Sequence, residues 1–278
     1  MAVRPSVGVA LGIVLATLVA GACAGSNGVP RATANALAAS APPASRGPVV
    51  ATNAEIAGAS PTGTSSAAAA DPCAVNGADL PVGEICMASF TSADEPAPPY
   101  ARYTIPTEGW RTFNGAYKDV DGPGGNQRVG ALFVMISGLM VDACREQVPS
   151  EPAIGATVDD LATALASLPP FEVTAGPTDV TAFGHAGKHL EIRVPLEQPS
   201  TGFESFTGCG GSLLKTWISP GHVSSAFNGY TAPGDTEQFW ILDVAGQRLV
   251  VSALTSANAS NDLIKERQAL LDSVQIVD

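Results

Sequence analysis

The stretch FWILDVAGQRLVVSALT, Phe239–Thr255, decides the fold. Two apolar segments, Gln238–Val244 and Gln247–Thr255, are separated only by the dipeptide Ala245-Gly246. A two-residue link that contains glycine is typical of a tight β-hairpin, because glycine adopts the backbone angles that the turn requires. The sequence therefore predicts two long antiparallel strands here.

Upstream, the run VGALFVMIS at Val129–Ser137 has no polar residue until its end, which predicts a central strand buried on both faces. The hairpin expected at Thr178–Phe183 and Lys188–Val194 alternates apolar and polar residues in its second arm, as a strand with one buried face does. Residues Asp121–Asn126 have the composition of a loop. Further short strands are expected at Ala101–Ile105, Trp110–Phe113, Leu213–Ile218 and Val274–Ile276.

Two helices interrupt these strands. Thr157 is a suitable N-cap for a helix whose apolar residues recur every three or four positions, and Pro169-Pro170 ends it. Ser260 caps a second helix at Asn261–Asp272. Many strands with one helix in the middle and one at the end predict an α+β fold, in which a mostly antiparallel sheet is covered by helices.

The order of these elements resembles the PsbP-like domain of small actinobacterial exported proteins and lipoproteins. The resemblance depends on the Gly109-Trp110 strand start, the VGALFVMIS strand, the Thr157-capped helix and the closing hairpin and helix. It covers residues 100–278. It implies an accessory or binding domain and supplies no active site.

The composition excludes one large class of function. The chain has 278 residues and a formal net charge of −12, with no basic cluster, so it would repel the phosphates of a nucleic acid. Every Phe, Tyr and Trp lies at or after Phe90. A segment without aromatic residues buries little surface, so the folded part is expected after that point.

The N-terminus has the pattern of an export signal. Arg4 precedes an apolar run, Val7–Ala20, which is too short to span a bilayer comfortably. The sequence LVAGAC at Leu18–Cys23 resembles a bacterial lipobox, in which Cys23 would be acylated after cleavage of residues 1–22. The same small residues also fit ordinary secretory cleavage, so plain secretion stays open.

The next segment, 23–72, is rich in Ala, Ser, Pro and Gly and lacks apolar periodicity. It cannot offset the entropy of ordering, which predicts a disordered tether. A disulfide-bearing extension is expected at 73–99 and the α+β domain at 100–278.

Four cysteines remain once Cys23 is assigned to lipidation. An even number in an exported chain predicts two disulfides. Because Cys73 and Cys86 are neighbours that flank a loop, we pair them with each other and pair Cys144 with Cys209. Their spacing lacks a C-x-x-C motif, which argues against a metal site.

No catalytic, cofactor or metal-binding residues are assigned. His185 and His189 would lie too far apart on a strand to hold one ion, and although a turn at Gly184–Gly187 could bring them closer, no third ligand completes a set. Ser212–Lys215 matches an S-x-x-K motif without its companion motifs. His222 and Asp243 could belong to a Ser-His-Asp triad, but the sequence has no G-x-S-x-G motif that would supply its serine. Trp110, Trp217 and Trp240 could line a pocket, but Trp217 and Trp240 lie in predicted strands and are expected in the core. A binding site is expected where the sheet meets its helices.

The sequence thus predicts an exported, lipid-anchored protein on the outer face of the cytoplasmic membrane or in the cell envelope. Its expected partners are the membrane, through the N-terminal lipid, and an unknown envelope ligand or protein. The folded part is expected to be a non-enzymatic binding or accessory domain without a cofactor. A cell-envelope hydrolase with an unrecognised site and a wall-associated sensor or structural protein are the alternatives.

Overall fold

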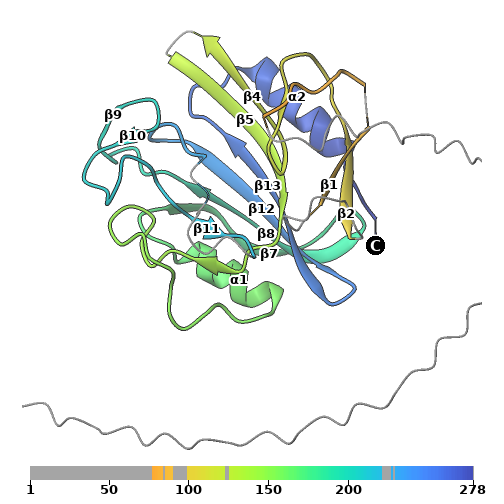
Figure 1. Ribbon diagram of the computed structural model, residues 1–278. Helices are drawn as coiled ribbons and strands as arrows, with labels where there is room; N and C mark the ends of the chain where they lie inside the picture. The colour runs from red at the N-terminus through yellow and green to blue at the C-terminus, as the bar shows by residue number, and fades with distance from the viewer. Residues whose placement is uncertain are drawn as a thin grey trace, which may run out of the picture. The chain divides into compact units, whose positions relative to one another are not determined.

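A seven-stranded antiparallel sheet forms the centre of the fold in the computed structural model (Figure 1). The structure describes residues 77–83, 85–89, 99–122, 125–220, 227 and 229–277. The predicted signal peptide and tether, and with them Cys23 and Cys73, lie outside the described residues. The strands of the large sheet follow one another in the order β3 (Arg111–Thr112), β4 (Gly115–Gly122), β5 (Gly125–Val134), β13 (Gln247–Thr255), β12 (Thr236–Val244), β8 (His185–Arg193) and β7 (Glu172–Ala182).

The hairpin predicted around Ala245-Gly246 is confirmed as β12–β13. Val244 pairs with Gln247, and the two turn residues Ala245 and Gly246 have φ angles of 50° and 80°. The predicted central strand is also confirmed, since β5 lies between β4 and β13 and is buried from Val129 to its end at Val134.

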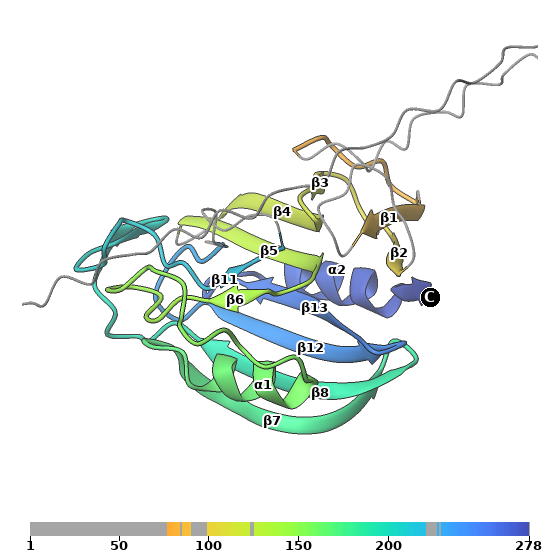
Figure 2. The same ribbon diagram turned by 60° about the horizontal axis from the view of Figure 1, so that its bottom comes forward.

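Both predicted helices are present. Thr157 caps α1 (Val158–Ala166) in a capping box with Asp160, and Ser260 caps α2 (Asn261–Asp272). The helices lie against opposite faces of the large sheet: α1 contacts β7, β8 and β12, whereas α2 contacts β5 (Figure 2).

The expected α+β fold, a sheet covered by helices, is wrong. The described residues form fourteen strands and only two helices, so the fold is mostly β. Beside α2, one face is covered by a second antiparallel sheet of β1 (Ile85–Ser89), β2 (Tyr100–Thr104) and β14 (Gln275–Val277). The other face is covered by α1 and by long loops that carry two short pairs, β6 (Gly138–Leu139) with β11 (Trp217–Ile218) and β9 (Ser200–Gly202) with β10 (Ser205–Phe206).

Three segments account for the difference. Strand β1 was not predicted, although Cys86 within it is fully buried. Strand β4 was also missed, and the expected loop at Asp121–Asn126 is a β-hairpin in which Gly122 pairs with Gly125. The strand expected at Leu213–Ile218 is confined to Trp217–Ile218, because Lys215 donates its backbone N–H to Ala143 in a loop.

The two faces of the large sheet hold separate apolar cores. Trp110, Tyr103 and Phe133 lie in the core beneath α2 and the small sheet. Phe239, Tyr230 and Trp217 lie in the core beneath α1 and the loops. We call the second face the α1 face, and the candidate site lies on it.

Candidate functional site

An apolar pocket of about 190 Å³ lies on the α1 face, at the end of the sheet formed by β4 and β5. Nine residues line it: Phe113, Tyr117, Arg128, Gly130, Leu132, Glu204, Phe227, Gly229 and Leu254. We call it the Gly130 pocket. Its lining residues come from several elements that are far apart in the sequence, so only the folded chain creates it.

The floor of the pocket is a row across three strands. Tyr117 on β4 pairs with Gly130 on β5, and Gly130 pairs with Leu254 on β13. Gly130 has no side chain to fill the space above it. A Cβ atom there would lie 3.4 Å from the Ala116 carbonyl oxygen and 3.4 Å from the Tyr117 Cβ, which is close to ordinary contact. A larger side chain at this position would therefore fit the backbone and occupy the pocket.

Phe227 forms one wall of the pocket. Its ring stacks on Trp217 with a centroid distance of 4.7 Å and meets the edge of Tyr230 at 6.2 Å. A Cβ atom on Gly229 would collide with the Phe227 ring, so the ring can occupy this position only because residue 229 is a glycine. The wall is thus braced from behind by the apolar core.

An ion-pair network borders the mouth. Arg128 donates from Nε to Asp119 Oδ1 at 2.6 Å and from Nη1 to Glu204 Oε1 at 2.5 Å, and Nη1 also approaches the Gly229 carbonyl at 3.3 Å. Burial lowers the pKa of Arg128, but its hydrogen bonds to the two carboxylates outweigh that effect and raise the pKa overall. Because Glu204 lies in the β9–β10 turn, the network ties that hairpin to β5.

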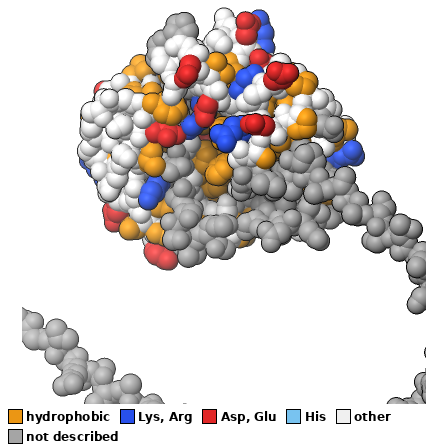
Figure 3. Space-filling model, turned by 45° about the horizontal axis from the view of Figure 1, so that its top comes forward, with side chains coloured by type: hydrophobic (Ala, Val, Ile, Leu, Met, Phe, Trp, Pro, Cys, Tyr) orange, Lys and Arg blue, Asp and Glu red, His pale blue; other side chains and the backbone are white. Residues whose placement is uncertain are grey.

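The guanidinium of Arg128 also lies near aromatic rings. Its central carbon is 6.0 Å from the Tyr117 ring centroid and 5.2 Å from that of Phe203. On the face drawn in Figure 3, hydrophobic side chains are exposed next to basic and acidic ones. The mouth of the Gly130 pocket therefore combines the paired Arg128 guanidinium with apolar surface.

A buried carboxyl lies next to the pocket. Glu237 on β12 pairs with Leu254, so it continues the row formed by Tyr117, Gly130 and Leu254. It is fully buried and accepts hydrogen bonds from the hydroxyls of Tyr230 and Ser252.

Burial raises the pKa of Glu237 to about 7, although the Ser252 and Tyr230 hydroxyls act in the opposite direction. The Trp217 indole N–H also lowers this pKa, but it makes no hydrogen bond of normal geometry. Burial likewise raises the pKa of Tyr230 well above its usual value. The pocket thus lies beside a carboxyl that binds a proton more readily than an exposed one.

The expectation that a site would lie where the sheet meets its helices is only partly met. A groove of about 510 Å³ does lie between α1 and strands β7 and β8. Lys188 in this groove binds Asp159 at 2.9 Å and Asp179 at 2.7 Å, so its charge is already paired within the protein. The apolar pocket lies instead beside the β9–β10 hairpin, and α1 supplies none of its lining residues.

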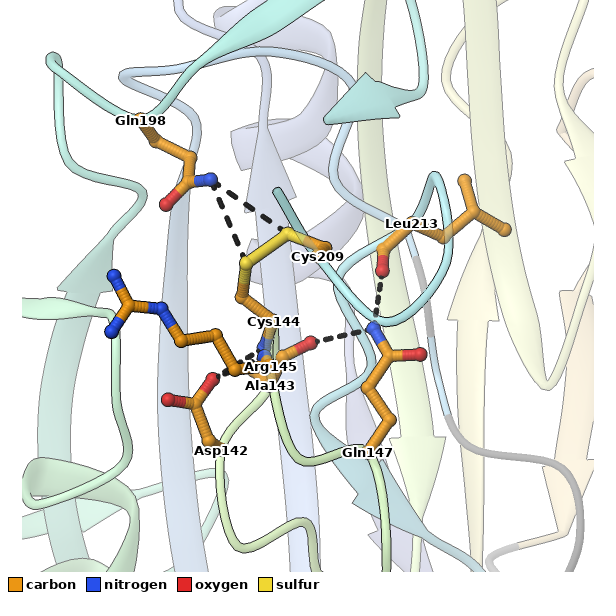
Figure 4. Close-up of a disulfide and its surroundings, with 8 residues drawn as sticks. All are labelled: Asp142, Ala143, Cys144, Arg145, Gln147, Gln198, Cys209 and Leu213. Carbon is orange, nitrogen blue, oxygen red and sulfur yellow. Dashed lines mark hydrogen bonds between the residues drawn. A yellow bond between two sulfur atoms is a disulfide. The ribbon is translucent and has the colours of Figure 1, made fainter. Parts of the chain in front are cut away.

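The structure contains the predicted disulfide between Cys144 and Cys209, with Cα atoms 4.3 Å apart (Figure 4). Asp142 accepts hydrogen bonds from the backbone N–H groups of Cys144 and Arg145, and Gln198 Nε2 approaches both sulfur atoms at 3.7 Å. The bond joins the loop after β6 to the loop after β10.

The remaining cysteines are only partly described. Cys86 is disulfide-bonded and fully buried in the core beneath α2. Its predicted partner, Cys73, and the predicted lipidation site, Cys23, lie outside the described residues. The pairing of Cys73 with Cys86 therefore stays a prediction.

The other described residues that were considered in the sequence do not line the pocket. His185 and His189 both lie on β8, and the His189 ring packs on Trp240 at 5.1 Å. Burial lowers the pKa of His189. Asp243 accepts a hydrogen bond from Gly246 in the turn, and His222 lies outside the described residues. Within the described ranges, no group of three His, Cys, Asp or Glu side chains could hold a metal ion.

Sequence reasoning missed the residues that build the pocket. Gly130 is the one signal available, because a glycine inside an apolar strand often marks a close approach by another group. The pairing of Arg128 with Glu204 and the burial of Glu237 have no local signature.

Comparisons with known proteins add little to this picture. No protein-family model matches the chain, and no curated protein matches it. The similarity to PsbP-like domains therefore stays a resemblance. One solved structure, "Crystal structure of LpqN involved in cell envelope biogenesis of Mycobacterium tuberculosis", is 10% identical over 70% of this chain and 92% of that one, with a TM-score of 0.34. Across the described residues, no helix is long and apolar enough to cross a membrane.

Proposed function

We propose that this chain is an exported, lipid-anchored protein of the cell envelope whose β domain binds the apolar part of a ligand in the Gly130 pocket without catalysing a reaction. The N-terminal sequence supports export and acylation at Cys23. The single observation that supports binding is the pocket itself, which is apolar, partly open and floored by a glycine.

The pocket has the properties of a binding site rather than a packing defect. Its walls are fixed before any ligand arrives, since Phe227 is braced by Trp217 and Arg128 is held by two carboxylates. Preformed apolar pockets with a few fixed polar groups are the usual form of small-molecule sites. Binding then costs little reorganisation.

Binding without catalysis is supported by what surrounds the pocket. The described lining residues include no Ser, Cys or His, and their one carboxylate, Glu204, is paired with Arg128. The nearby Ser252 and Tyr230 are buried, and their hydroxyls are hydrogen-bonded to Glu237.

The test is to fill the pocket. Gly130→Leu places a side chain into it from β5, and Leu254→Phe does so from β13. Gly176→Leu on β7 is the matched control, because a Cβ there would meet nothing within 4 Å. The ligands are 2-naphthol and its saturated analogue decahydro-2-naphthol, titrated by calorimetry into the full chain with Cys23→Ala, which prevents lipidation.

We expect the Gly176→Leu protein to bind like the parent, and both filled variants to bind at least about tenfold more weakly, a loss of about 1.4 kcal/mol. Thermal unfolding of each variant establishes that it is folded. Unchanged affinity in both folded pocket-filling variants, or no binding of either ligand to the parent protein, would overturn the proposal.

A further inference from the structure

We infer that the Gly130 pocket selects a planar, uncharged aromatic group of a small molecule over an aliphatic group of the same size. This inference depends on the proposed binding function and specifies its ligand. It is drawn from the side chains that surround the pocket and from the pocket's volume.

Aromatic side chains form much of the lining. Phe113 follows β3, Tyr117 lies on β4 and Phe227 lies in the segment that leads to β12, so three rings from different parts of the chain line the pocket. Aromatic rings attract one another in offset or edge-to-face arrangements, because the ring edge is electropositive and the face electronegative. A saturated guest fills the same volume without that attraction.

Arg128 limits the charge that a guest can carry. A guanidinium attracts the face of an aromatic ring, and Arg128 already lies over Tyr117 at the pocket mouth. Its charge is neutralised by Asp119 and Glu204, which are 2.6 Å and 2.5 Å away. An anionic guest would meet those two carboxylates and a cationic guest would meet the guanidinium, so the ring that binds is expected to be uncharged.

The volume sets the size of the guest. An engineered apolar cavity of about 150 Å³ binds benzene. At about 190 Å³, the Gly130 pocket is slightly larger and has an open mouth. One ring, or two fused rings that partly protrude, therefore matches it.

The experiment compares 2-naphthol with decahydro-2-naphthol, which have the same carbon skeleton and one hydroxyl each. Both are titrated by calorimetry into the full chain with Cys23→Ala. We expect the aromatic compound to bind about tenfold more tightly than the saturated one, the size of a favourable aromatic contact. Phe113, which is 44% exposed, can be replaced without disturbing the core.

Phe113→Leu should lower the preference by about threefold while the affinity for decahydro-2-naphthol stays within about twofold. Phe183→Leu is the control, because Phe183 packs on Trp240 and belongs to the core on the opposite face of the sheet. Equal affinities for the two compounds, or tighter binding of the saturated one, would overturn this inference and leave the proposed binding function standing. Failure of both compounds to bind would overturn the proposed function itself.

Discussion

The natural protein should become less stable as the pH rises from 5.5 to 8, because Glu237 is buried. Replacing Glu237 with glutamine should remove this part of the pH dependence. Glu237 is fully buried, and no Lys, Arg or His of the described residues contributes to its pKa. Glutamine has nearly the same shape: its amide oxygen can accept a hydrogen bond from one of the two hydroxyls, Tyr230 or Ser252, and its NH2 group can donate one to the other.

The direction follows from the raised pKa. The folded protein holds the Glu237 proton up to about pH 7, whereas the unfolded chain releases it near 4.5. Between these values the unfolded state binds fewer protons, so rising pH favours unfolding. Each pKa unit corresponds to about 1.4 kcal/mol, and from pH 5.5 to pH 8 the expected loss is about 2 kcal/mol.

Urea unfolding followed by tryptophan fluorescence measures this effect. Both pH values lie above the isoelectric point of about 4.6, where solubility is lowest. The Glu237→Gln protein should show a pH dependence that is smaller by about 2 kcal/mol over this range. Comparing the two proteins cancels the other titrating groups, including Asp235, whose pKa burial raises.

Two further variants complete the test. Glu197→Gln is the control for losing one carboxyl, because Glu197 is exposed after β8, and it should not reduce the pH dependence as Glu237→Gln does. Glu237→Leu removes the acceptor of two buried hydroxyls and should destabilise the protein at every pH, by about 1–3 kcal/mol for each hydroxyl left unpaired. Parallel pH curves for the natural protein and Glu237→Gln would refute the reasoning.

Three other predictions concern the cysteines and the N-terminal segment. The Cys144–Cys209 bond joins residues 65 positions apart, and its reduction should lower the free energy of unfolding by about 4 kcal/mol, or the melting temperature by roughly 10 °C. Cys209→Ser should reproduce most of that loss. A melting temperature that reduction leaves unchanged would contradict this prediction. Cys23→Ala should release the protein from membranes or block its processing, which fractionation detects; unchanged membrane association would argue against acylation. Limited proteolysis should cut first between residues 24 and 70 and leave a stable fragment ending at Asp278, and protection of that stretch would show that it is packed.

Local patterns predicted the elements that depend on local physics. The β12–β13 hairpin could be predicted because Ala245-Gly246 adopts the turn and the flanking runs are apolar. The helix starts at Thr157 and Ser260 could be predicted because a side-chain oxygen there accepts a backbone N–H hydrogen bond of the first turn. The Cys144–Cys209 pair was inferred from loop positions and from the even number of cysteines.

The fold class and the pocket depend on long-range pairing, which one sequence does not display. Strand β4 has the sequence GAYKDVDG, whose polar residues and glycines read as a loop until β5 pairs with it. Gly130 reads as one more residue of an apolar strand, since its neighbours Tyr117, Leu254 and Phe227 are brought to it only by folding. Glu237 occupies a position near the start of a strand that the sequence alone gives no reason to bury.

A crystal structure of the full chain with Cys23→Ala, grown with 2-naphthol, tests the central claim most directly. The account predicts the naphthol ring in the Gly130 pocket, in contact with Gly130, Leu132 and Phe227, with the Arg128–Glu204 bridge at its mouth. An empty pocket at saturating ligand, or a ring bound only elsewhere on the protein, would contradict it.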